Sequence, residues 1–218
     1  MKLKHKGIIF DLDGTLIDTL GDIAASMNKA LKLKGFPELP AEEYKGKVGW
    51  GINRLAFLSL PENERKQETA DLVAADASEF YAENPLNYSR PYPGIPELIS
   101  ALKQRKIRMS VLTNKPDPVA QMVIARIFPT DTFECVRGEI NGYPKKPDPA
   151  CVWELLVDLD LMPANIIFVG DSEIDMEIAI SSGCYALGVS WGYRTRELIE
   201  NAGAKRIIDN PNELLEFF

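Results

Sequence analysis

Short apolar runs alternate with helical patterns along most of the chain. The runs rich in β-forming residues lie at residues 8–10, 107–112, 133–136, 166–169, 185–189 and 207–208. Between the later runs, apolar residues recur at the spacings of an amphipathic helix, as at Ile95, Leu98, Ile99 and Leu102, and at Val119, Val123 and Ile127. Residues 210–213 predict a capped start to a last helix. Strands that alternate with helices predict an α/β fold with a doubly wound parallel sheet.

The first connection is too long for its place in this pattern. Residues 11–106 separate the first two strands, about three times the roughly 30 residues of a complete βαβ unit. A helix at about 95–105 already supplies the crossover, so the excess at residues 18–88, whose patterns are helical, is expected to form an inserted domain. The sequence SRPYPG at 89–94 has the turn residues of a return linker. We therefore expect an α/β core domain from residues 1–17 and 89–218, and a small helical cap domain from residues 18–88.

Composition narrows the classes of function. The net charge of −7 argues against nucleic-acid binding, which relies on lysine and arginine to neutralise phosphates. No apolar stretch approaches the roughly 18 residues of a membrane span, so no membrane association is expected. The three cysteines are odd in number and far apart, which favours reduced thiols and a cytoplasmic location. The single histidine, His5, disfavours Ser-His-Asp chemistry and histidine-rich metal sites.

Polar and charged side chains follow the ends of three predicted strands. Asp11 and Asp13 come directly after the first strand, in the sequence GIIFDLDGT. Thr113, Asn114 and Lys115 follow the second strand. Lys145 and Lys146 precede the helix before the fourth strand, and Asp171 and Asp175 follow the fourth strand. Ligands of open α/β sheets bind outside the carboxyl ends of the strands. These side chains would therefore converge if the first strand lay between the second and the fourth.

Four short motifs in this order resemble those of the haloacid dehalogenase superfamily. They are DLDGT at 11–15, LTNK at 112–115, KKPDP at 145–149 and GDSEID at 170–175. The resemblance covers nearly the whole chain, and the helical insert corresponds to the C1 cap of that family. It implies a Rossmann-like core sheet in which the first strand does lie between the second and the fourth.

The resemblance implies roles for the acidic residues. Asp11 matches the nucleophile, which forms an aspartyl-phosphate, and Asp13 matches the acid that protonates the leaving oxygen and later deprotonates water. Mg²⁺ is the implied cofactor, with Asp11, the backbone oxygen of Asp13 and Asp171 as its ligands. Asp175 would orient the site from behind these ligands. Its simpler interpretation is a first-turn acid that interacts with the helix dipole.

The same resemblance assigns the phosphoryl-binding groups. Thr113 and Lys146 would hold the transferring phosphoryl oxygens, because positioning and charge stabilisation are most of what phosphoryl transfer requires. The backbone amide of Asn114 is a further candidate for binding the phosphate, unless this residue serves only the turn. Lys145 is expected to be a solvated neighbour of Lys146.

Substrate specificity is expected to lie in the insert. The segment GKVGWGINRL at 46–55 resembles the glycine-bearing substrate loop of phosphoglycolate phosphatase-like caps. Trp50 and Arg54 are its candidate substrate-binding residues, and Lys47 is a second cation that could bind a substrate carboxylate. A tight turn that starts a lid helix, with both cations on the surface, explains the same segment equally well.

A phosphate-ester enzyme fits these residues best, since phosphonatases of the superfamily carry alanine where this chain has Asp13. We expect a Mg²⁺-dependent phosphatase of small phosphorylated metabolites, with phosphoglycolate as the leading substrate candidate, acting as a monomer or homodimer. A sugar phosphomutase is the nearest alternative, because it uses the same first motif. A non-catalytic phosphometabolite sensor is an alternative of another class, although simple binding needs no nucleophile beside an acid.

Overall fold

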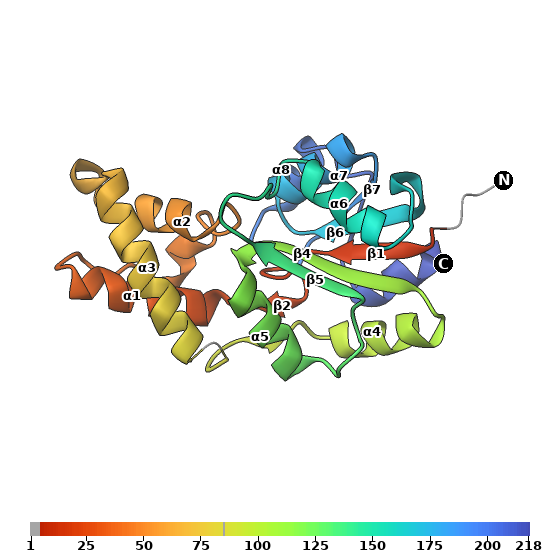
Figure 1. Ribbon diagram of the computed structural model, residues 1–218, viewed down its shortest axis with the longest axis horizontal. Coiled ribbons are helices and arrows are strands. Elements are labelled where there is room, and N and C mark those ends of the chain that lie inside the picture. Colours follow the sequence, from red (N-terminus) through yellow and green to blue (C-terminus); the bar gives the residue numbers. More distant parts are fainter. Residues whose placement is uncertain (1–4, 85) are drawn as a thin grey trace.

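The computed structural model describes residues 5–84 and 86–218, and its centre is a six-stranded parallel sheet (Figure 1). The strands are β1 (Gly7–Phe10), β4 (Arg108–Pro116), β5 (Cys135–Glu139), β6 (Ile166–Gly170), β7 (Tyr185–Val189) and β8 (Arg206–Ile208). Their order across the sheet is β5-β4-β1-β6-β7-β8. All six apolar runs of the sequence are therefore strands, and β1 lies between β4 and β6 as expected.

Helices cover both faces of this sheet. In Figure 1, α6 (Ala150–Asp158), α7 (Glu173–Ser182) and α8 (Arg196–Asn201) lie on one side, and α4 (Ile95–Gln104) and α5 (Asp117–Ile127) on the other. Strand β1 contributes side chains to the apolar cores on both faces of the sheet, because successive side chains of a strand point to opposite faces. Ile8 and Phe10 belong to the apolar core with α4 and α5, and Ile9 belongs to the core with α6 and α7. The prediction of a doubly wound α/β fold is confirmed.

The long connection after β1 is helical, as its patterns predicted. It contains α1 (Leu20–Leu33), α2 (Ile52–Ser59) and α3 (Gln67–Glu83), with short 3₁₀ turns at Ala41–Tyr44 and Glu62–Glu64. Helix α3 contacts both α1 and α2. Figure 1 shows these three helices grouped together beyond one end of the sheet.

Two short strands pair with each other beside this helical group, one in the connection before α1 and one in the connection after α3. Strand β2 (Ile17–Asp18) pairs antiparallel with β3 (Arg90–Pro91). The buried carboxylate of Asp22 reinforces the pairing, because it accepts hydrogen bonds from the backbone amides of Tyr88 and Ser89 and from the Ser89 hydroxyl. A linker was expected at residues 89–94 and no strand at residues 17–18, so this small sheet is a finding of the structure.

The remaining elements are short. A 3₁₀ turn covers Pro163–Asn165, and a longer 3₁₀ helix covers Pro211–Phe217. The second begins at a capping box of Asn210 and Glu213, so its predicted capped start is confirmed. Within residues 5–84 and 86–218, no helix has the length and apolar character to cross a membrane.

Candidate active site

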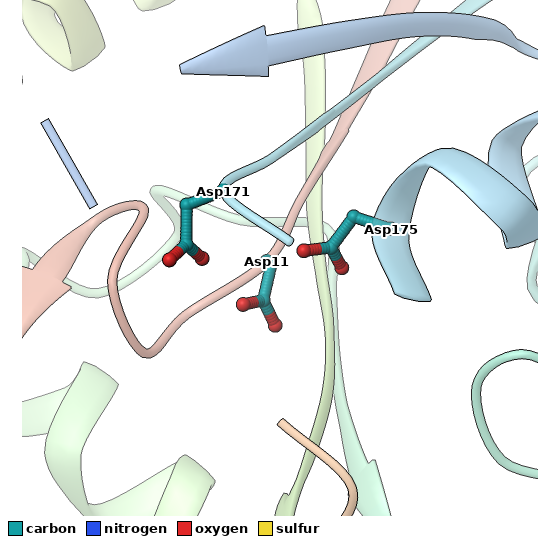
Figure 2. Close-up of side chains that lie close together, drawn as sticks. All are labelled: Asp11, Asp171 and Asp175. Carbon is teal, nitrogen blue, oxygen red and sulfur yellow. The ribbon is translucent and has the colours of Figure 1, made fainter. Parts of the chain in front are cut away.

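The order of the strands brings three acidic side chains together. Asp11 follows β1 and Asp171 follows the neighbouring strand β6, while Asp175 lies in the first turn of α7. Figure 2 shows the three carboxylates turned toward one another, and oxygen atoms of all three lie within 4.8 Å of one another. All three residues are buried. Carboxylates so close together and removed from water repel one another strongly and require cations.

Lys146 supplies one of these cations. Its Nζ atom lies 2.6 Å from Asp11 Oδ1 and 2.7 Å from Asp175 Oδ1, and its side chain is 3% exposed. Burial alone would lower the pKa of this lysine, but the attraction of Asp11 and Asp175 outweighs it and raises the pKa above its ordinary value. Lys146 is therefore a permanently charged group held against Asp11.

Asp175 is fixed by the start of α7. Its Oδ2 atom accepts hydrogen bonds from the Ser172 hydroxyl at 2.6 Å and from the Ser172 amide at 3.1 Å, which forms a capping box. Its Oδ1 atom is left to accept the bond from Lys146. Asp175 therefore caps the start of its own helix with one oxygen and binds Lys146 with the other.

Asp13 lies in a separate polar cluster beside Asp11. Thr19 Oγ1 donates a hydrogen bond to Asp13 Oδ1 at 2.7 Å, and Lys115 Nζ lies 2.9 Å from the same oxygen. On its other side the ammonium of Lys115 lies 4.1 Å from the ring centroid of Tyr81, a residue of α3. Tyr81 was not among the candidates predicted from the sequence, and Lys115, a candidate of the LTNK motif, had no role assigned to it.

Asn114 and Thr113 have different positions at the end of β4. The Asn114 side chain donates hydrogen bonds to the backbone oxygens of Gly49 and Lys146, each at 2.9 Å, and accepts one from the Lys146 amide. Its side chain is therefore occupied in holding two loops. Thr113 is buried beside the acidic cluster and lines the same cavity as Asp11.

Asp171 differs from the other two acids because it lacks a cation. In the described part of the chain no lysine or arginine lies within 4.0 Å of it, and it accepts hydrogen bonds only from the Tyr193 amide at 2.7 Å and the Thr15 hydroxyl at 3.3 Å. Burial and the nearby charge of Asp175 raise its pKa to about 7. A side chain on Gly14, where φ is +88°, would collide with Asp171, so only glycine lets the loop after Asp13 come this close.

The donor set suits a hard divalent cation. Asp11 and Asp171 offer carboxylate oxygens from two adjacent strand ends, and their pKa values are both raised, chiefly by burial. Among the described residues, Lys146 pairs with Asp11 and Asp175 and no cation pairs with Asp171, so the ionised cluster would have an uncompensated negative charge. Clustered carboxylate and backbone oxygens are the ligands that Mg²⁺ and Ca²⁺ take in proteins. These residues therefore fit the metal that the sequence analysis expected.

The acidic cluster opens into a cavity of about 70 Å³ between the sheet and the inserted helices. At on the order of 15 Å³ for each water molecule, this space holds about five waters, which is the size of a small ligand. Six residues of the inserted segment give it an apolar wall: Ile23, Met27, Val48, Ile52, Leu55 and Ala77.

The structure leaves the three cap-loop candidates outside this cavity. Helix α2 begins at Ile52 and turns Ile52 and Leu55 toward the cavity, so Arg54 between them is on the solvent side and stacks on Phe57. Trp50 is 38% exposed. Lys47 folds back to donate a hydrogen bond to the backbone oxygen of Glu43. In this structure the segment is a turn into α2, and Lys47, Trp50 and Arg54 do not line the cavity.

Two residues after β7 were missed by the sequence analysis. Arg194 donates hydrogen bonds to the backbone oxygens of Lys45 and Val48 in the cap loop, and its Nε atom lies 3.0 Å from Glu173 Oε2. Tyr193 donates a hydrogen bond through its amide to Asp171, and its hydroxyl accepts one from the Thr19 amide. The segment WGYR at 191–194 contains no feature that marks these contacts in advance, because they depend on the folded position of the insert.

Comparison with known proteins agrees with this geometry. The haloacid dehalogenase-like hydrolase family matches residues 8–189, and the chain therefore belongs to that family. A phosphoglycolate phosphatase from Mannheimia succiniciproducens is 34% identical over 99% of both chains, and one from Aquifex aeolicus is 32% identical over 85% of both. The crystal structure of a predicted phosphoglycolate phosphatase from Haemophilus somnus 129pt is similar, with a TM-score of 0.89 and 30% identity over 98% of this chain and 97% of that one. The chain is thus a hydrolase of phosphoglycolate phosphatase-like character.

Proposed function

We propose that the protein is a Mg²⁺-dependent phosphatase of small phosphate monoesters that acts through an aspartyl-phosphate on Asp11. The observation that carries this proposal is the contact of Asp11 with Lys146 in a small cavity that Asp13 also lines. A ligand-binding protein would not need a buried carboxylate at the position where an anion must bind, because like charges repel. A nucleophile requires that placement. The names of the relatives point to the same reaction class.

The first half of the reaction uses Asp11 and Asp13. An oxygen of Asp11 attacks phosphorus, and the bond from phosphorus to the ester oxygen breaks. Asp13, in its protonated form, gives its proton to the departing oxygen, so an alcohol leaves. Lys146 and Thr113 hold the phosphoryl oxygens, and the ammonium of Lys146 stabilises the charge that develops on them.

The second half returns both residues to their starting state. Asp13, now a carboxylate, takes a proton from water while the water oxygen bonds to phosphorus. The bond from phosphorus to Asp11 breaks, inorganic phosphate leaves, and the Asp11 carboxylate is restored. When bound by Asp11, Asp171 and the backbone oxygen of Asp13, Mg²⁺ would supply positive charge that offsets repulsion between these carboxylates and the phosphate.

We assign residues 18–88 as a cap domain that closes over this chemistry, and residues 1–17 and 89–218 as the core. The contacts of Arg194 and Asn114 with the backbone of the cap loop support this assignment, because they fasten the cap to the core in a closed position. Closure excludes water from the phosphoryl group, and opening releases the products. The paired segments β2 and β3 lie at the two crossings between the domains and are the natural hinge.

The raised pKa of Asp171 predicts how metal binding depends on pH. Between about pH 4 and pH 7 the folded protein holds a proton on Asp171 that the unfolded chain has lost, so the free energy of unfolding of the metal-free protein falls as pH rises through this range. Added Mg²⁺ competes with that proton. We therefore expect Mg²⁺ to raise the Tm more at pH 8 than at pH 5, as measured by thermal unfolding at both values. An Asp171→Asn control should lose this difference, and an equal rise at both pH values in the wild type would contradict the assignment.

A panel of small phosphate monoesters tests the proposed function. We expect Mg²⁺-dependent release of inorganic phosphate, with 2-phosphoglycolate as the leading substrate, because the relatives bear that name and the cavity admits only a small leaving group. Sugar phosphates too large for the closed cavity should have much lower kcat/KM. Failure of every ester in the panel to release phosphate would contradict the proposal. Retention of phosphate on a sugar bisphosphate would instead identify a phosphomutase.

A further inference from the structure

Three cations line the cavity, and two of them are fully engaged. Lys146 is paired with Asp11 and Asp175, and the guanidinium of Arg194 bonds to Glu173 and two backbone oxygens. Lys115 is different. Its Nζ atom donates to both oxygens of one acidic partner, Asp13, at 2.9 Å and 3.2 Å, and lies over the ring of Tyr81. An ammonium has three donors, so Lys115 retains one donor for an anion in the cavity.

Tyr81 contributes a second unused donor at the same place. Its side chain lines the cavity from the cap side and is 5% exposed, yet its hydroxyl has no hydrogen-bond partner among the described residues. Burial raises the pKa of this hydroxyl, so it keeps its proton and can donate. Buried hydroxyls normally have partners, so this one is free to bond to a water or to a ligand group in the cavity.

The other side chains of this wall offer no free donor to a negative charge. Its six apolar residues have no donor, and the hydroxyls of Ser26 and Ser78 donate to backbone oxygens within their own helices. Arg54 is outside the cavity on the solvent side of α2, and Lys47 does not line the cavity either. Among the side chains that face the leaving group from the cap side of the cavity, Lys115 and Tyr81 are therefore the donors available to a carboxylate.

We propose that Lys115 and Tyr81 form the carboxylate-binding site that selects the substrate. The inference rests on the proposed phosphatase function with 2-phosphoglycolate as its substrate, and it adds the residues that recognise the carboxylate of that substrate. Asp13 must touch the ester oxygen to protonate it, and Lys115 Nζ lies 2.9 Å beyond Asp13 Oδ1. In 2-phosphoglycolate the carboxylate carbon is two bonds from that ester oxygen. Lys115 can therefore contact Asp13 and the substrate carboxylate together, with Tyr81 closing from the cap.

The test compares 2-phosphoglycolate with ethyl phosphate, which has a similar size and no carboxylate. Tyr81→Phe removes one oxygen and keeps the ring beside Lys115. We expect this variant to lower the ratio of the two kcat/KM values, 2-phosphoglycolate over ethyl phosphate, by about tenfold, the usual effect of one hydrogen bond to a charged group. The Tm of the empty protein should be unchanged or higher, because the lost hydroxyl has no partner to leave unpaired. An unchanged ratio would overturn the proposal for Tyr81.

Lys115→Met and Arg54→Met separate the two possible sources of positive charge. We expect Lys115→Met to lower the same ratio by at least about tenfold, and Arg54→Met to leave it within about twofold of wild type. If Arg54→Met lowers this kcat/KM ratio instead, Arg54 and not Lys115 binds the carboxylate. An equal loss on both esters in Lys115→Met would mean that Lys115 only positions Asp13. Each of these results overturns the inference while phosphatase activity persists, whereas a wild-type protein inactive on both esters would contradict the proposed function itself.

If Lys115→Met does not fold, a double variant that also removes the charge of Asp13 is used for the test. Asp13→Asn combined with Lys115→Met removes both members of the ion pair, which avoids a buried charge without a partner. Its ratio of dissociation constants for the two esters is compared with that of Asp13→Asn alone. We expect the second substitution to weaken binding of 2-phosphoglycolate by about tenfold more than binding of ethyl phosphate. Equal weakening would reject a role for Lys115 in substrate choice.

Discussion

Replacing Asp11 with asparagine is expected to lower kcat by at least about a hundredfold, or about 2.7 kcal/mol of transition-state free energy. The amide is nearly isosteric with the carboxylate but is not nucleophilic, so the aspartyl-phosphate cannot form. Asp11 is 6% exposed and lies 2.6 Å from Lys146, so the substitution changes a group inside the reaction cavity. Steady-state release of phosphate from 2-phosphoglycolate measures the effect.

An exposed carboxylate provides the matched control for this substitution. Asp71 lies on the surface of α3 and accepts hydrogen bonds from Asn53 and Gln67. Asp71→Asn makes the same chemical change far from the acidic cluster and should retain nearly full activity. Activity of Asp11→Asn above about 1% of wild type, in protein freed of contaminating phosphatases, would exclude Asp11 as the nucleophile.

Removing divalent metal should have an effect of similar size. Treatment with EDTA is expected to lower phosphate release by more than about a hundredfold, because Asp11 and Asp171 would then repel the substrate phosphate without compensation. Added Mg²⁺ should restore activity. Excess Ca²⁺ should lower it again, because Ca²⁺ takes more ligands at longer distances and would displace Asp11 relative to phosphorus.

The metal dependence also has an internal control. Asp171→Asn removes one proposed metal ligand and leaves Asp11, Asp13 and Lys146 in place. This variant should need a much higher concentration of Mg²⁺ for half-maximal activity. Undiminished hydrolysis by thoroughly metal-stripped wild-type protein would contradict the metal site, and an unchanged Mg²⁺ requirement in Asp171→Asn would remove Asp171 from it.

The core of the fold could be predicted because each buried strand is a short continuous apolar run that ends at polar residues. The stretch from Ile166 to Gly170 followed by Asp171 is an example, and its neighbours in the sheet follow from the resemblance of the four motifs. The sheet of β2 and β3 could not be predicted, because strands of two residues have no periodicity. Its pairing depends on Asp22 binding a segment that lies 66 residues further along the chain.

Some residues of the candidate site could likewise be predicted from the sequence, and others could not. Asp11, Asp13, Asp171 and Lys146 follow strand ends or belong to short motifs, so local sequence marks them. The carboxylate-binding candidates do not have such a mark. Lys115 stands in a motif, but its contact with Tyr81 of α3 joins segments far apart in the sequence and exists only in the folded chain. Arg54 was favoured from the sequence for its charge, and the period of α2 turns it to solvent.

The central claim is that the phosphoryl group passes through Asp11, and trapping that intermediate tests it most directly. Wild-type protein is mixed with excess 2-phosphoglycolate and Mg²⁺, quenched in acid during the first turnover, digested and analysed by mass spectrometry. We predict a phosphoryl group on Asp11, in the peptide containing DLDGT, and none in the same peptide from Asp11→Asn. Release of phosphate at full rate with no phosphoryl group on Asp11, or with the group on another residue, would contradict the mechanism.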